Sequence, residues 1–120
     1  MVPAKVNLEE KFREVDTAWT PRIVAEVNDF FVKIVKLRGE FVWHRHESED
    51  ELFLVTKGEF TVRLRDRDVR LREGELFVVP RGVEHMPVAA HEAHVLLLER
   101  KSTVNTGDAG GERTVAPEWV

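Results

Sequence analysis

A chain of 120 residues that is 42% apolar and 33% charged can bury one hydrophobic core and is too short for two ordinary domains. It has no cysteine, which excludes disulfides, thiolate nucleophiles and metal sites with cysteine ligands. Its net charge of −4 argues against non-specific binding to nucleic acid or to membrane surfaces.

The N-terminal sequence MVPAKVNLEEKF lacks the continuous apolar segment of a signal peptide. No apolar run approaches the roughly 20 residues that a membrane-spanning helix needs. We therefore expect a cytoplasmic protein with no membrane partner.

The first predicted element is a short helix at 7–15. Asn7 can cap its N-terminus, and an apolar face is formed by Leu8, Phe12 and Val15.

Short apolar segments separated by turn-forming residues follow this helix. The pair Asn28-Asp29 suits a tight hairpin between the first two segments. About eight strands are expected, at 22–27, 30–37, 40–46, 51–57, 59–65, 68–72, 76–80 and 93–100. Many short strands after one helix are typical of an all-β sandwich or barrel.

Two histidines lie close together in the third of these strands. His44 and His46 are separated by one residue, so their side chains share a face, with Cα atoms about 6.7 Å apart. Both imidazoles can therefore reach one metal ion. Glu51 begins the next strand and shares a face with Phe53 and Val55, so its carboxylate is predicted to point toward an interior.

Three further acidic residues lie between the histidines and Glu51. Carboxylates are seldom buried without a partner. We interpret Glu47, Glu49 and Asp50 as a solvated loop.

A second half-site is predicted within 74–87. Pro80 ends the donation of strand hydrogen bonds and Gly82 permits a reversal, so the chain doubles back and presents His85. Three histidines and one carboxylate then complete a set of four ligands: His44, His46, Glu51 and His85. A metal that favours five or six ligands would keep positions for water or substrate.

The two half-sites resemble the motifs of the cupins. Residues 39–58 read G-x4-H-x-H-x4-E-x6-G, which is one residue shorter after the first glycine than the usual family pattern. Residues 74–85 read G-x5-P-x-G-x2-H, and Ala89 stands where the family usually has asparagine. Neither departure changes a ligand.

The resemblance implies a double-stranded β-helix barrel, a relative of the jelly roll, with a short N-terminal helix and one divalent metal in the barrel mouth. Family members use manganese, iron, nickel, zinc, cobalt or copper. We expect one domain over residues 1–120, with a helix and arm (1–20), a barrel (21–100) and a C-terminal tail (101–120). Trp119 is expected to dock the tail, because an indole is seldom left in water.

Cupins include dioxygenases, decarboxylases, sugar isomerases and proteins that bind ligands without known chemistry, so the fold alone does not define the function. The resemblance implies a protein that binds or transforms a small sugar- or carboxylate-like molecule. Two hypotheses stay open: a metal-dependent enzyme (dioxygenase, isomerase or decarboxylase) and a non-catalytic small-molecule sensor. No catalytic residue is assigned, and the candidate pocket residues are Phe53, Val55, Phe77 and Met86.

Two histidines remain outside this set. His91 is predicted to lie in a turn and His94 at the start of the last strand. Their spacing indicates no ligand geometry, so we interpret both as structural or surface residues.

The arginine-rich segment 63–72 alternates charged with apolar residues and lacks aromatic partners. This pattern favours a solvated outer hairpin face over a nucleic-acid site.

The segment 51–55 is apolar on both faces, whereas a strand with one face in water should alternate. Burial of the second face against another copy of the chain is a natural solution. We therefore expect a homodimer.

Overall fold

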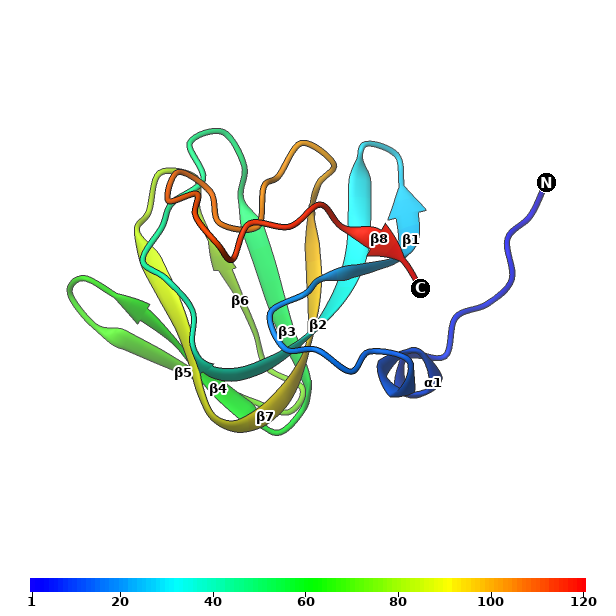
Figure 1. Cartoon of the computed structure of the whole chain (residues 1–120), viewed down its shortest axis with the longest axis horizontal. Coiled ribbons are helices and arrows are strands. Elements are labelled where there is room, and N and C mark those ends of the chain that lie inside the picture. Colours follow the sequence, from blue (N-terminus) through cyan, green and yellow to red (C-terminus); the bar gives the residue numbers. More distant parts are fainter.

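The computed structural model describes residues 1–120. A short helix precedes eight strands, as Figure 1 shows, so the predicted all-β fold with one N-terminal helix is confirmed. The elements are α1 (Leu8–Arg13), β1 (Arg22–Val27), β2 (Phe30–Glu40), β3 (Glu51–Lys57), β4 (Glu59–Leu64), β5 (Asp68–Arg72), β6 (Leu76–Val79), β7 (His85–Arg100) and β8 (Glu118–Trp119). The helix spans six residues and is far too short to cross a membrane.

Helix α1 begins at the predicted cap. The Asn7 side chain accepts a hydrogen bond of 3.0 Å from the backbone N–H of Glu10. Phe12 and Val15 pack in a small apolar cluster with Ile34 of β2, so the helix covers part of the outer face of the sheet. The N-terminal arm before the helix projects away from the body of the molecule (Figure 1).

Strand β7 organises the sheet. It pairs in antiparallel fashion with β2 along most of its length, with β4 through its first residues and with β3 through its last ones. β1, β5 and β6 extend the sheet from β2, β4 and β3, and the strands curve around a common interior (Figure 1). The interior is filled by thirteen buried apolar residues: Trp19, Val35, Leu37, Phe53, Val55, Phe60, Val62, Leu71, Val79, Ala89, Ala93, Val95 and Leu97.

Two predictions about local structure are wrong. The segment 40–46 is not a strand: β2 ends at Glu40, and beyond it only His44 pairs, as an isolated bridge to His85. His91 lies not in a turn but within β7. His91 faces solvent, and the strand continues through it because Ala89 and Ala93 on either side pair with Gly39 and Leu37 of β2.

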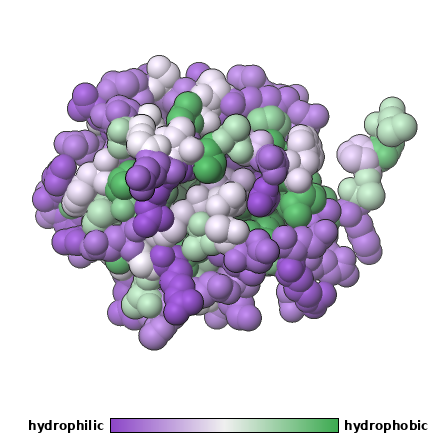
Figure 2. Space-filling model, in the orientation of Figure 1, coloured by the Kyte–Doolittle hydropathy of each residue, from purple (hydrophilic) through white to green (hydrophobic).

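The arginines of the β4–β5 hairpin lie outside the barrel, as predicted. Their side chains are exposed, and several meet acidic partners. Arg70 donates two hydrogen bonds to Glu59, of 2.7 and 3.2 Å, and Arg65 donates one of 3.2 Å to Glu84. Much of the surface in Figure 2 is hydrophilic in the same way, with hydrophobic residues in small groups.

The C-terminal tail docks on the sheet, as expected. Its strand β8 pairs in parallel with β1. Trp119 contacts the edge of Phe31, with ring centroids 6.2 Å apart. It nevertheless remains 57% exposed, because β8 is an edge strand of two residues and nothing lies beyond it.

Candidate metal centre and adjoining cavity

The structure brings the four predicted ligands together. His44 and His46 follow β2, whereas Glu51 is the first residue of β3 and His85 the first of β7. One potential ligand atom from each residue lies within 4.8 Å of the others, and all four side chains are buried. The His44 and His46 rings share this interior although their segment is not a strand, because His44 bridges to His85 and Arg45 between the two histidines is exposed.

Backbone hydrogen bonds fix the two half-sites against each other. The N–H of His44 donates to the carbonyl of His85 at 3.0 Å, and the N–H of His85 donates to the carbonyl of His44 at 2.9 Å. The N–H of Gly82 donates to the carbonyl of His46 at 2.8 Å, so the reversal after Pro80 is tied to the same segment. The predicted turn therefore delivers His85 to the histidine pair.

The acidic loop residues stay outside the ligand group, as predicted, but they are not merely solvated. Asp50 accepts a hydrogen bond of 2.8 Å from the backbone N–H of Arg81, which braces the turn that presents His85. Glu49 accepts one of 3.0 Å from Ser102 in the tail, and Glu47 accepts one of 2.6 Å from the Arg45 side chain.

Backbone carbonyls set the tautomers of two ligand histidines. Nδ1 of His44 lies 2.8 Å from the carbonyl of Val42, and Nδ1 of His85 lies 2.9 Å from the carbonyl of Val83. A carbonyl can only accept, so each Nδ1 carries the proton and each Nε2 keeps its lone pair. Metal-ligating histidines are commonly held by such a second hydrogen bond.

One buried nitrogen of the group lacks a partner. Nε2 of His46 makes no hydrogen bond, although Oε1 of Glu51 lies 3.5 Å away; the same oxygen is 3.3 Å from Nε2 of His85. A buried polar atom without a partner is costly and calls for an explanation. Three imidazole nitrogens and one carboxylate form a donor set that fits a divalent transition metal, and the group could hold such an ion.

Burial and charge together set the protonation of the group. Burial, with the neighbouring His85, lowers the pKa of His44 to about 4. Burial alone would lower the pKa of His46, but the nearby carboxylate of Glu51 raises it above its usual value. Burial alone would raise the pKa of Glu51, but its neighbours, Glu99 foremost, hold it well below its usual range. The group therefore presents a carboxylate anion beside a neutral imidazole, which suits a cation.

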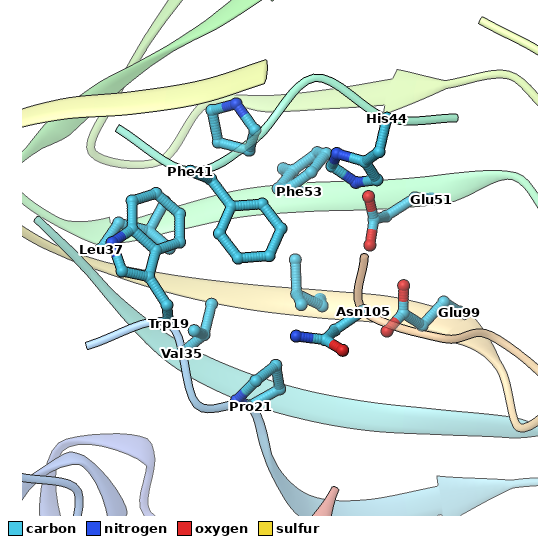
Figure 3. A pocket seen from close by; sticks show the side chains of 12 residues that line it. Trp19, Pro21, Val35, Leu37, Phe41, His44, Glu51, Phe53, Glu99 and Asn105 are labelled. Atoms are coloured by element: carbon cyan, nitrogen blue, oxygen red, sulfur yellow. The ribbon is translucent and has the colours of Figure 1, made fainter. Parts of the chain in front are cut away.

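A cavity adjoins the group, and His44 and Glu51 form part of its wall (Figure 3). In the figure, His44, Glu51 and Glu99 lie on one side of the cavity, and Trp19, Leu37 and Phe41 lie on the other. The other lining residues are Trp19, Pro21, Val35, Leu37, Phe41, Phe53, Pro87, Leu97, Glu99 and Asn105.

Of the candidate pocket residues, Phe53 lines this cavity, whereas Val55, Phe77 and Met86 do not. Val55 shares the inward face of β3 with Phe53 but lies two residues further from the end that carries Glu51, within the core. Phe77 is on β6, and Met86 is buried on β7 opposite Arg63. An inward-facing or buried position therefore does not by itself place a residue in the wall of the cavity beside the ligand group.

Several lining residues escaped the sequence analysis. Glu99 had a usable signal, because it shares the alternate positions of Val95 and Leu97 and so points inward with them. Trp19 and Asn105 had none, since each comes from an irregular segment outside the two motifs.

His91 and His94 do not belong to this site, which agrees with the interpretation of both as structural or surface residues. His94 stacks on Phe12 of the helix, with ring centroids 4.4 Å apart, and its Nε2 lies 3.0 Å from Glu92. His91 is exposed. Neither residue lines the cavity beside the ligand group.

Comparison with known proteins places these features in a family. A family model described as the cupin domain matches residues 31–99, which include all four candidate ligands. The solved structure of a cupin-2 domain containing protein from Shewanella frigidimarina NCIMB 400 aligns with a TM-score of 0.78 and 42% identity, over 79% of this chain and 93% of that one.

Two curated relatives are more distant. The uncharacterized protein YdbB of Bacillus subtilis (strain 168) is 35% identical over 63 residues, or 52% of this chain and 56% of YdbB. A 3-hydroxyanthranilate 3,4-dioxygenase of Danio rerio is 28% identical over 104 residues, or 80% of this chain and 36% of that enzyme. The matched part thus spans about half or less of each curated relative. From the matched family model and the shared fold, we conclude that the chain belongs to the cupin family.

Proposed function

We propose that this cupin binds one divalent transition metal through His44, His46, Glu51 and His85, and that the adjoining cavity binds or transforms a small sugar- or carboxylate-like molecule. Manganese, iron, nickel, zinc, cobalt and copper are all compatible with a donor set of three nitrogens and one oxygen. The observation that supports the proposal is the convergence of four buried ligand atoms within 4.8 Å, one of which has no other partner.

When bound, a divalent metal would polarise an oxygen of the ligand as a Lewis acid, and iron would add dioxygen chemistry. The chain itself supplies orientation. The carbonyls of Val42 and Val83 hold two imidazoles in the ligating tautomer, and Glu51 contributes the negative charge. The apolar cavity wall excludes water beside the site, which strengthens electrostatic interactions there.

Metal analysis of protein purified without chelator tests the proposal. We expect about one metal ion per chain, and much weaker metal binding in His85→Ala, because this variant loses one of the four protein ligands. The matched control is His91→Ala, which removes an exposed histidine of the same strand and should leave the metal content unchanged. Metal-free wild-type protein that also fails to take up added zinc, cobalt or iron would refute the proposal.

A dioxygenase is the second candidate, favoured by the match of 80% of this chain to a 3-hydroxyanthranilate 3,4-dioxygenase. The test is oxygen uptake by iron-loaded protein with 3-hydroxyanthranilate, beside the same protein treated with chelator. Uptake that depends on iron would support the enzyme. A non-catalytic sensor would instead be stabilised by its ligand without consuming it, by about 2.7 kcal/mol at a hundred times the dissociation constant.

We also propose a homodimer formed through the outer face of β3, β6 and β7. Two rows of paired residues across this face are wholly aliphatic: Val32, Leu98, Leu52 and Val78, and Ile34, Leu96, Leu54 and Leu76. Helix α1 covers the β2 end of the rows, whereas at the β6 end Leu76 is 57% and Val78 41% exposed. A contiguous apolar face beside a free strand edge suits a second copy related by two-fold symmetry.

A further inference from the structure

The cavity beside the ligand group is too small for an organic ligand. Its volume is about 40 Å³, little more than the roughly 30 Å³ that one water molecule occupies in the liquid. Sites that bind small organic molecules typically have volumes of about 300–1,000 Å³. A sugar- or carboxylate-like molecule therefore enters this cavity only if part of its wall moves.

Most of the wall is held by the sheet. The lining residues on the paired strands β2, β3 and β7 are Val35, Leu37, Glu51, Phe53, Pro87, Leu97 and Glu99. Glu99 is also held by Lys33 of β2, whose Nζ donates to its Oε1 at 2.9 Å. The backbone N–H of Trp19 donates to the carbonyl of Lys36 in β2 at 2.8 Å. These parts of the wall move only if the sheet is disrupted.

The C-terminal tail is the part of the wall that the sheet does not hold. Asn105 lines the cavity from this tail (Figure 3), which runs from the end of β7 across the barrel to β8 (Figure 1). No residue from 101 to 117 has a buried apolar side chain. Segments with few buried apolar contacts open at a low cost in free energy. The tail is therefore the part of the wall that can move most easily.

Hydrogen bonds inside the tail make one segment of it a compact unit. The side-chain amide of Asn105 donates to the carbonyl of Arg113 at 2.8 Å. The hydroxyls of Thr106 and Thr114 are hydrogen-bonded to each other. Both connections lie within residues 104–115, which we call the lid. Because they join its two halves, the lid can move as one body.

The lid contacts the barrel at two places. Oδ1 of Asp108 accepts from the backbone N–H of Arg45 at 2.8 Å, and the N–H of Asp108 donates to the carbonyl of Arg45 at 3.0 Å. No other hydrogen bond joins the lid to the barrel. The guanidinium of Arg113 lies 5.7 Å from the ring centroid of Trp19 and 5.8 Å from that of Phe41. Arg45 separates the two ligand histidines, so the lid covers the metal centre together with the cavity.

We propose that the lid opens as one body, by releasing Asp108 from Arg45 and Arg113 from the two aromatic rings, and that this opening admits molecules to the metal centre and its cavity. Strands β7 and β8 hold the lid at its two ends, so it stays attached when open. Lids of this kind control access to many binding sites. The inference rests on the proposed function, because the molecule admitted is the ligand of that site.

Amide hydrogen exchange of the wild-type protein, followed by NMR, tests the motion. The N–H of Asp108 is bonded to the barrel and is released each time the lid opens. The N–H of Val115 is bonded to Oδ1 of Asn105 inside the lid, at 3.1 Å, and stays bonded. Asp108 should therefore exchange faster than Val115, and the amides paired within the sheet should exchange slowest. Exchange of Asp108 as slow as that of the sheet amides, or equal to that of Val115, would overturn the proposal.

Zinc is the probe of access to the centre. The rates measured are zinc uptake by metal-free protein and zinc release to a chelator, in wild type and in Arg113→Ala, which keeps the carbonyl that Asn105 contacts. A lid that opens more easily speeds uptake and release by the same factor and leaves the dissociation constant unchanged, whereas a weakened metal site speeds release alone. The expected factor is about two- to fivefold, the effect of one exposed cation–π contact. Unchanged rates, or faster release alone, would overturn the proposal.

A second variant releases the other contact. Asp108→Ala removes the acceptor for the N–H of Arg45 and should speed uptake of zinc by about tenfold, the effect of one hydrogen bond to a charged group. The matched control is Glu112→Ala, which removes one negative charge from an exposed residue of the same lid and should leave the rate unchanged. Equal effects of the two variants would mean that charge, and not the contact with Arg45, sets the rate, and would overturn the proposal.

The two proposals fail in different ways. Protein that takes up no zinc would refute the metal centre, and amide exchange would still decide whether the lid opens. Protein that takes up zinc at a rate that neither Arg113→Ala nor Asp108→Ala changes would reject the lid and keep the metal centre.

Discussion

Each ligand histidine in this site is controlled by a different neighbour. Val42 and Val83 hold the rings of His44 and His85 through their carbonyls, whereas the Nε2 of His46 lies 3.5 Å from the carboxylate of Glu51. Burial keeps His44 neutral, with a pKa of about 4, and Glu51 favours a proton on His46. His44 and His46 therefore differ in how strongly a proton competes with a metal.

This difference predicts a pH dependence of metal binding. Because the pKa of His46 is raised, a proton competes with the metal near neutral pH, whereas His44 begins to compete only near pH 4. A protonated imidazole cannot ligate, so affinity should fall as the pH falls, by up to about tenfold per pH unit for each proton displaced. Competition titrations with a zinc indicator from about pH 8 to about pH 6 would measure this slope. A flat profile over this range would show that His46 is not a ligand.

The Lys33–Glu99 pair makes a second prediction at this scale. Lys33→Met leaves the Glu99 carboxyl buried without a counter-charge, so the free energy of unfolding should fall by about 3–5 kcal/mol. Lys33→Met with Glu99→Leu should recover most of that loss. Urea denaturation of the two single variants and the double variant gives the coupling energy of the pair. Additive losses would mean that the two charges do not interact.

At the scale of elements, β7 and the tail do most to shape the site. β7 carries His85 at its start and Glu99 near its end, and its pairing with β2, β3 and β4 brings both to one interior. The tail closes over the same end. Asp108 accepts a hydrogen bond of 2.8 Å from the backbone N–H of Arg45, between the two histidines. The guanidinium of Arg113 lies 5.7 Å from the Trp19 ring centroid.

Gly107 is the point of closest approach between the tail and the site. Its φ is +54°, and a Cβ there would overlap the carbonyl oxygen of Arg45 and lie 3.2 Å from the His44 ring. Gly107→Ala should therefore displace the tail, lower the free energy of unfolding by about 2–4 kcal/mol and weaken metal binding.

Gly110→Ala is the matched control, because Gly110 also has a positive φ, +61°, but has open space around its Cβ position. It should cost only the backbone strain of about 1–2 kcal/mol and leave metal binding unchanged. Urea denaturation and metal titration of both variants separate the steric overlap from the strain. Equal effects would mean that the contact of the tail with Arg45 is not tight.

At the scale of the whole molecule, the barrel has two apolar sides and the chain covers only one of them fully. The inner side forms the core, and α1 covers part of the outer side. The uncovered rows on β3, β6 and β7 are the basis of the proposed dimer.

Leu76→Glu combined with Val78→Glu should convert the dimer to a monomer, because two charges at the centre of an apolar interface lose their hydration without gaining a partner. Light scattering after size-exclusion chromatography measures the mass directly. Val104→Glu places a charge at another exposed apolar residue, 49% exposed and in the tail, and should leave the dimer intact. A monomeric wild-type protein would refute the proposed interface.

The sequence by itself determined the all-β class, the capped helix and the grouping of His44, His46, Glu51 and His85. The first two depend on short-range information, namely alternation along strands and a cap beside a helix, whereas the ligand grouping depends on the two cupin-like motifs, the second of which reverses at Pro80 and Gly82. Only the tertiary structure decided that β7 runs unbroken through His91, that 40–46 is irregular, and that Trp19, Glu99 and Asn105 meet in one cavity. These features arise from pairing and packing between segments far apart in the chain, and local residue patterns do not specify such contacts.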